Sequence, residues 1–156
     1  LNTEQQQNYA RKLGSDCAFF IENKPILAVE RGDHFLPIQL PDLSQYYILL
    51  VYPAVHVSTQ LAYSQVTPQI PVYSLEKILT EQPITTWKGV VSNDFEKSVF
   101  TAFPLLAHIK QQLYDLGAIY AAMSGSGSTL FGIFEQLPEN LNCFEGYTTW
   151  SGKMYR

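Results

Sequence analysis

The segment 123–131 holds the residues of this chain that are best suited to phosphate chemistry. It reads Met-Ser-Gly-Ser-Gly-Ser-Thr-Leu-Phe, so glycines and serine hydroxyls alternate between apolar flanks. Glycine permits positive φ angles and close approach of a ligand, and successive amide N–H groups in such a turn can hold an anion. The sequence therefore predicts a phosphate-contacting loop formed by Gly125, Ser126, Gly127 and Ser128. A purely structural turn is the alternative, since a single glycine-rich loop is a weak motif.

Asp16 is a candidate catalytic carboxylate. It follows Gly14 and precedes an apolar stretch that we expect to be a strand. A carboxylate held there could accept a hydroxyl proton or orient an alcohol for phosphoryl transfer. The alternative is a turn aspartate that bonds its own backbone, which is the commoner role after glycine. The residues alone favour the turn role.

A third polar group, His56, Thr59 and Tyr63, follows the clearest buried strand of the sequence. Thr59 and Tyr63 are four residues apart and would share one face of a helix. An aromatic ring in that place could stack on a nucleobase, or it could pack in the core. His34, His56 and His108 lack the spacing of metal ligands, and we predict no metal held by this chain.

The cluster Asn93-Asp94-Phe95-Glu96 favours a structural role. Asn93 is a suitable helix N-cap. Asp94 and Glu96 suit the positive end of a helix dipole. We therefore interpret this cluster as the start of a helix rather than as a catalytic group.

The pattern along the chain predicts the elements that would position these residues. Helices are expected at 4–13, 57–65, 74–80, 93–100 and 104–116, the last two separated or kinked by Pro104. Strands are expected at 16–22, 25–31, 46–52, 118–123 and 129–135, with a loop at 66–73 and an edge strand in the tail from 145. This irregular alternation predicts an α+β, ferredoxin-like two-layer sandwich, with helices on one face of a mostly antiparallel sheet.

Composition restricts the kind of partner. The 156 residues are 46% hydrophobic and 15% charged, with a net charge of −4, which argues against nucleic acid as a partner. No apolar run approaches the ~20 residues of a membrane span. Cys17 and Cys143 are expected to be free thiols in a reducing cytoplasm. The chain begins at Leu1 within a helical pattern, so we interpret it as a piece of a longer protein.

Four segments together resemble the GHMP kinase superfamily, and within it the kinases of 4-diphosphocytidyl-2-C-methyl-D-erythritol. Residues 13–20 resemble the signature Leu-Gly-Ala-Asp-Val-Pro-Phe-Phe, with Ala18 where proline is common. Residues 53–63 resemble Pro-x-x-x-Val-Ser-Thr-x-x-x-Tyr/Phe, and 93–96 resemble Asn-Asp-(Phe/Leu)-Glu. Residues 123–131 resemble the third motif of the superfamily. The resemblance extends to about residue 135, and we assign no motif to the tail after residue 140.

The resemblance implies transfer of the ATP γ-phosphoryl group to the 2-hydroxyl of 4-diphosphocytidyl-2-C-methyl-D-erythritol, in the non-mevalonate isoprenoid pathway. Asp16 would then orient or deprotonate that hydroxyl, Tyr63 would stack on the cytosine, and Thr59 would lie near the substrate. Gly125 to Ser128 would form the floor of a phosphate pocket. Mg²⁺ is expected with ATP because this reaction depends on positioning and charge neutralisation.

The family's amino-terminal half, with its catalytic lysine and main phosphate loop, is not part of this sequence. We therefore expect residues 1–15 to be a remnant helix of that missing domain and 16–156 to be the carboxy-terminal, substrate-side domain. The missing half would be the principal protein partner, and the chain alone is expected to be inactive. Another GHMP kinase, of mevalonate or homoserine type, and a non-catalytic α+β ligand-binding module remain the alternatives.

Overall fold

The computed structural model describes residues 1–30, 32, 34–64, 66–67 and 72–155. It divides the chain into two compact units, Leu1–Pro41 and Asp42–Arg156. The division therefore lies after residue 41, whereas the sequence suggested a boundary after residue 15. That residues 1–15 belong to an amino-terminal domain stays a prediction.

The first unit begins with helix α1 (Thr3–Arg11), which Asn2 and Gln5 close with a reciprocal capping box. The 3₁₀ helix η1 (Ser15–Ala18) and the short helix α2 (Phe19–Glu22) follow and contact α1. Strands β1 (Ile26–Val29) and β2 (His34–Pro37) form an antiparallel pair.

The expected strand at 16–22 is wrong, because this segment is helical. An apolar run of this length fits a buried strand or a buried helical turn equally well by pattern. Packing against α1 decides for the helical form, and Ala18 becomes fully buried. The second expected strand, at 25–31, is confirmed as β1.

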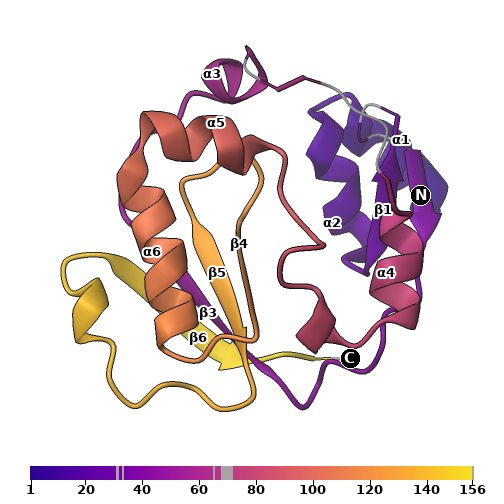
Figure 1. The fold of residues 1–156 in the computed structure, drawn as a ribbon. Coiled ribbons are helices and arrows are strands. Elements are labelled where there is room, and N and C mark those ends of the chain that lie inside the picture. The colour runs from indigo at the N-terminus through magenta and orange to yellow at the C-terminus, as the bar shows by residue number, and fades with distance from the viewer. Residues whose placement is uncertain (31, 33, 65, 68–71, 156) are drawn as a thin grey trace. The chain divides into compact units, whose positions relative to one another are not determined.

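The second unit is built on a four-stranded antiparallel sheet in the order β4-β5-β3-β6. Its strands are β3 (Tyr47–Tyr52), β4 (Tyr120–Met123), β5 (Leu130–Phe134) and β6 (Thr148–Lys153). The expected edge strand in the tail is confirmed as β6, which pairs with β3. Because β4 and β5 are neighbours, the glycine-rich segment is the connection of an antiparallel hairpin (Figure 1).

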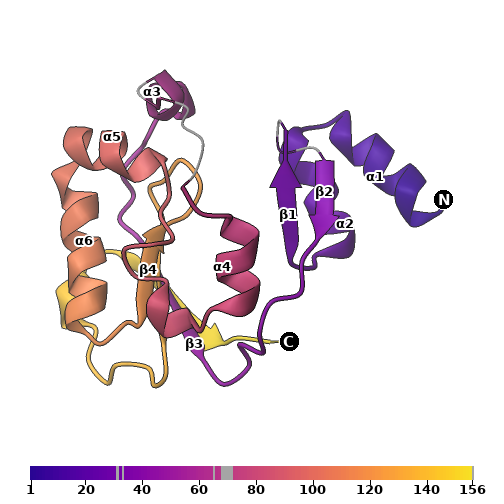
Figure 2. The same ribbon diagram turned by 45° about the vertical axis from the view of Figure 1, so that its right-hand side comes forward.

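Helices of the second unit are α3 (Thr59–Ser64), α4 (Leu75–Glu81), α5 (Phe95–Ala102) and α6 (Pro104–Asp115), with 3₁₀ turns η2 (Ile84–Thr86) and η3 (Asn142–Phe144). Pro104 occupies the first position of α6, where proline is tolerated, and so separates two helices rather than kinking one. Helix α6 contacts β4 and β5, and α5 contacts both α6 and α3 (Figures 1 and 2).

The alternation of side chains along β4 produces two hydrophobic clusters. Ala121 and Met123 join the larger one, together with Leu106 and Ile109 of α6. Tyr120 and Ala122 belong to the second cluster, on the opposite face of the strand. There they are grouped with Leu43, Ile84, Trp87 and Ile133, and with the partly buried Ile78 and Leu79 of α4.

The expected α+β class with an antiparallel sheet and packed helices is confirmed, and segments 43–46 and 78–91 add apolar cover for the second cluster. Cys17 and Cys143 are free and exposed, as expected. Within the part of the chain that the structure describes, no helix is long and apolar enough to cross a membrane. The loop expected at 66–73 lies partly outside the described residues, as does the end of the helix expected at 57–65.

Candidate functional site

The loop between β4 and β5 is a tight turn whose backbone depends on its two glycines. Gly125 has φ +54° and Gly127 has φ +92°. A β-carbon on Gly127 would lie 2.7 Å from the sulfur of Met123, so a larger residue would require that side chain to shift and would adopt a strained backbone. The amide of Ser124 donates to the carbonyl of Thr129 (2.8 Å), and that of Gly127 donates to the carbonyl of Ser124 (3.0 Å).

The serines of this loop differ in their surroundings. Ser124 is exposed and Ser126 is half-buried, whereas Ser128 is only 4% exposed. The buried hydroxyl of Ser128 has no hydrogen-bond partner among the described residues. A buried polar group without a partner is destabilising, so this hydroxyl is an unfavourable feature of the loop in this structure.

Helix α3 brings Thr59 to the loop. The Thr59 hydroxyl lies 3.3 Å from the Ser126 hydroxyl, at hydrogen-bond distance. Tyr63, one turn further along α3, is 65% exposed, and its ring meets that of Phe95 edge-on at 4.8 Å between centroids. Thr59 and Tyr63 therefore lie one turn apart in one helix, as expected, and most of the Tyr63 side chain is exposed.

Asn93 connects the start of α5 to the loop. Its amide nitrogen donates to the carbonyls of Met123 and Gly125, each at 2.8 Å, and its oxygen accepts from the amide of Phe95 at 3.0 Å. The helix begins at Phe95, and Asp94 rather than Asn93 occupies the N-cap position. Asn93 therefore bonds to the first turn from the residue before the N-cap. Its two contacts to the loop were not predicted.

Glu96 lies in the first turn of α5, as expected, and it is buried, at 8% exposure. One carboxylate oxygen accepts from the amide of Met123 at 2.8 Å, and the other pairs with the Lys110 ammonium of α6 at 2.6 Å. The carboxylate is thereby compensated by a charge and a hydrogen bond, which buried charges require. Burial, together with Glu96 and Tyr114, raises the pKa of the nearby Tyr120 phenol well above its usual range.

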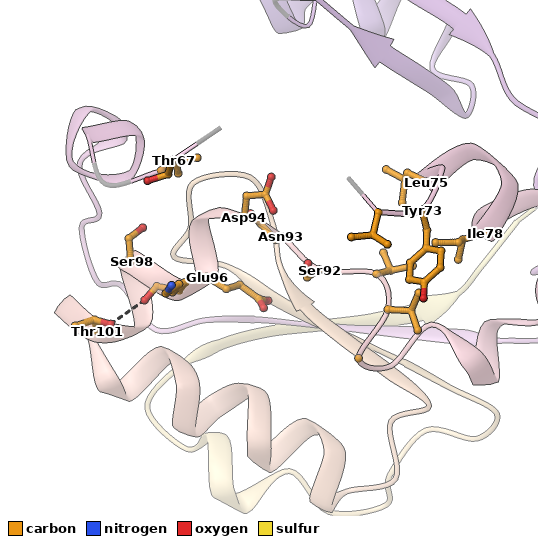
Figure 3. Close-up of a pocket in the computed structure, with 16 residues that line it drawn as sticks. Thr67, Tyr73, Leu75, Ile78, Ser92, Asn93, Asp94, Glu96, Ser98 and Thr101 are labelled. Atoms are coloured by element: carbon orange, nitrogen blue, oxygen red, sulfur yellow. Dashed lines mark hydrogen bonds between the residues drawn. The ribbon is translucent and has the colours of Figure 1, made fainter. Parts of the chain in front are cut away.

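A cavity of about 950 Å³ lies beside this arrangement (Figure 3). Polar side chains of α5 and the segment before it line one part, including Asp94, Glu96 and Ser98. Apolar side chains around α4 line the other part, including Tyr73, Leu75 and Ile78. The cavity therefore offers a polar and an apolar region to a small molecule.

Asp16 belongs to the first unit, in η1, with an exposed side chain. It lies on a 3₁₀ turn rather than before a strand, and its backbone carbonyl accepts from the amide of Phe19. His56 is exposed between β3 and α3, next to Val57, whose side chain lies 3.6 Å from the position of a β-carbon on Gly127. The structure therefore brings Thr59 and Ser126 together, with Tyr63 one turn away on α3, while Asp16 is described only within its own unit.

No group of three or more histidine, cysteine, aspartate or glutamate side chains in the described ranges could hold a metal ion.

Sequence reasoning assigned Asn93 and Glu96 to the helix start and did not single out Lys110. One signal could have indicated burial of Glu96: it precedes Val99 by three residues and Phe103 by seven, the spacing of one apolar helix face. A charged residue on such a face needs a partner. The pattern does not name that partner, which comes from the next helix.

Comparison with known protein families identifies the class to which this fold belongs. Residues 76–142 match the family described as "GHMP kinases C terminal", and the chain carries this GHMP kinase domain.

Curated relatives of this chain bear the name 4-diphosphocytidyl-2-C-methyl-D-erythritol kinase. The chain is 51% identical over 134 residues to that of Bacteroides fragilis, covering 86% of this chain and 48% of the relative. It is 46% identical to that of Cytophaga hutchinsonii, covering 91% and 52%, and 43% identical to that of Parabacteroides distasonis, covering 99% and 57%. The chain thus spans about half the length of the curated relatives it matches.

Two solved structures are similar to this chain in fold. A crystal structure of 4-(cytidine 5'-diphospho)-2C-methyl-D-erythritol kinase matches with a TM-score of 0.68 and 26% identity, covering 94% of this chain and 56% of that one. Homoserine kinase from Cytophaga hutchinsonii matches with a TM-score of 0.60 and 16% identity, covering 82% and 47%, which shows the shared fold alone.

Proposed function

We propose that this chain is the carboxy-terminal, substrate-side part of a cytoplasmic kinase that phosphorylates the 2-hydroxyl of 4-diphosphocytidyl-2-C-methyl-D-erythritol with ATP. The observation that carries the proposal is the group formed by Thr59, Tyr63 and the glycine loop, in a chain up to 51% identical to relatives of that name. The loop supplies hydroxyls and a tight glycine turn, and α3 supplies an exposed aromatic ring one turn beyond Thr59.

Each proposed role follows from the chemistry of the side chain. Tyr63 presents a ring 65% exposed, which suits stacking on the cytosine. Thr59 and His56 would contact the substrate. The loop from Gly125 to Ser128 would contact phosphate. Asp16 would orient or deprotonate the acceptor hydroxyl.

ATP would supply the phosphoryl group, and Mg²⁺ would neutralise phosphate charge. The phosphate oxygens of ATP would be ligands of that ion. The amino-terminal half present in the relatives would supply the remaining ATP contacts. We therefore expect the isolated chain to lack turnover.

The test is formation of ADP from ATP by the full-length protein, with 4-diphosphocytidyl-2-C-methyl-D-erythritol, mevalonate or homoserine as acceptor. Turnover with the cytidyl acceptor alone supports the proposal. A preference for mevalonate or homoserine would assign the protein to another GHMP kinase, and absence of turnover with all three would indicate a binding module.

Asp16→Asn in the same full-length protein tests the catalytic carboxylate. Loss of a general base costs about 10²- to 10⁴-fold in kcat. Asp115→Asn is the matched control, because Asp115 is exposed and accepts a hydrogen bond from Gln111, four residues earlier on α6. An unchanged kcat for Asp16→Asn would leave Asp16 as a turn residue.

A further inference from the structure

Strand β4 forms an edge of the sheet, and side chains rather than another strand satisfy its outer backbone groups. The sheet order places β5 on one side of β4 only. On the other side, the Tyr114 hydroxyl accepts from the amide of Ala121 at 3.1 Å and donates to its carbonyl at 3.2 Å. Two residues further along β4, the amide and carbonyl of Met123 are bonded by Glu96 and Asn93. This spacing of two is that of a strand, whose alternate residues present their backbone groups to the same edge.

The last of these contacts extends beyond the strand into the loop. Asn93 donates to the carbonyl of Gly125 as well as to that of Met123, so one amide group spans the first turn of the loop. The loop's own hydrogen bonds, Ser124 to Thr129 and Gly127 to Ser124, close the turn but do not attach it to the rest of the domain. Asn93 and Glu96 therefore connect the loop to α5.

Both residues are themselves held in place. Glu96 is fixed by the Lys110 ammonium at 2.6 Å, and Asn93 by the amide of Phe95 at 3.0 Å. Phe95 in turn packs against Tyr63. The segment 93–96 thus contacts both the loop and the proposed stacking residue.

We propose that Asn93 and Glu96 are positioning residues for phosphoryl transfer. They hold the glycine loop in the position and orientation in which it can contact a phosphate group. This inference rests on the proposed function. The two residues do not touch the reacting atoms and act through the backbone of Met123 and Gly125. Misplacement of the loop lowers the rate because phosphoryl transfer depends on positioning.

Two variants of Asn93 in the full-length protein separate this role from support of the helix. Asn93→Ala removes the side-chain hydrogen bonds to Met123, Gly125 and Phe95. Asn93→Asp has nearly the same shape and still accepts from the amide of Phe95, but it cannot donate to the carbonyls of Met123 and Gly125. Asn140→Ala is the matched control, since Asn140 accepts from the amide of Asn142 at 2.7 Å in a turn elsewhere.

The expected result is a fall in kcat of about tenfold in both Asn93 variants, since each loses two hydrogen bonds to the loop. The KM for ATP should rise while the KM for the acceptor stays within about twofold, a split that general destabilisation would not produce. Hydrogen exchange of segment 121–131 should be about tenfold faster in both variants. Asn140→Ala should match the wild type in all of these.

The inference is overturned if Asn93→Asp keeps the wild-type kcat while Asn93→Ala loses it, because Asn93 would then act only at the helix start. The inference is also overturned if both Asn93 variants keep the wild-type kcat. Asn93→Asp retains the hydrogen bond to Phe95. Its kcat therefore tests the positioning role even if Asn93→Ala does not fold. A wild-type protein without turnover would refute the proposed function; faster exchange in the variants would then support the attachment of the loop, and unchanged exchange would refute it.

Discussion

Thr59 and Ser126 are 67 residues apart in the chain, and their hydroxyl oxygens lie 3.3 Å apart in the structure. The first begins a helix and the second lies in the middle of a hairpin loop. Their contact joins the segment proposed to bind the substrate to the segment proposed to bind phosphate. A substrate that spans both would therefore have its reacting group held near the loop while its base lies near Tyr63.

Tyr63→Ala in the full-length protein should raise the KM for the cytidyl acceptor by about 10-fold to 100-fold, since stacking on a base contributes roughly 1–3 kcal/mol. Tyr63→Phe keeps the ring and should stay near the wild type. Steady-state kinetics with varied acceptor measures this effect. Tyr155→Ala is the control, as Tyr155 is 90% exposed and lies outside the proposed site. Equal KM values for Tyr63→Ala and the wild type would remove Tyr63 from the site.

Gly127→Ala should lower the free energy of unfolding by about 2 kcal/mol or more. The alanine would have to adopt a positive φ, and its β-carbon would crowd the core. Gly146→Ala is a matched control: Gly146 has φ +86°, close to that of Gly127, but a β-carbon there meets no atom within 4 Å. Thermal and denaturant unfolding of both variants measures the difference. If they are equally destabilised, the contact with Met123 contributes nothing.

Lys110→Met should lower the free energy of unfolding by about 2 to 4 kcal/mol, because it leaves the Glu96 carboxylate buried without its counter-charge. Lys24→Met removes an exposed ion pair, with an N–O distance of 3.7 Å, and should change it by at most about 1 kcal/mol. The combination of Lys110→Met with Glu96→Gln should cost less than the sum of the single changes. Additive effects would show that the two groups are not coupled.

Tyr120 should make stability fall at alkaline pH. Its pKa is raised in the folded state by burial and by Glu96, so the fold favours the neutral phenol. This contribution is fully present below the unfolded pKa of about 10 and is lost above it, by about 1.4 kcal/mol per pH unit. Tyr120→Phe should therefore show a shallower fall than the wild type, in denaturant unfolding at a series of alkaline pH values. Tyr155→Phe should fall as the wild type does, and identical slopes for Tyr120→Phe and the wild type would contradict the prediction.

The sequence by itself determined the elements whose signals are local. The apolar runs and turn residues of 118–135 indicated a strand, a glycine turn and a strand, and the structure forms β4, β5 and their connection there. Ser74 and Pro104 marked the starts of α4 and α6 correctly, because capping and the missing proline N–H act within one turn. The family was likewise recognisable, because its motifs are short and contiguous.

Only the tertiary structure decided which segments and side chains contact one another. Segment 16–22 has a strand-like composition but is helical, because its packing against α1 outweighs propensity. Asn93 and Glu96 read as helix-start residues, yet their side chains reach backbone groups of Met123 and Gly125 about thirty residues away. Such contacts carry no local sequence signal, since they depend on how α5 lies across the end of β4. The residue types that could do chemistry were visible in the chain, whereas the arrangement that holds the loop in place exists only once helix and sheet have packed.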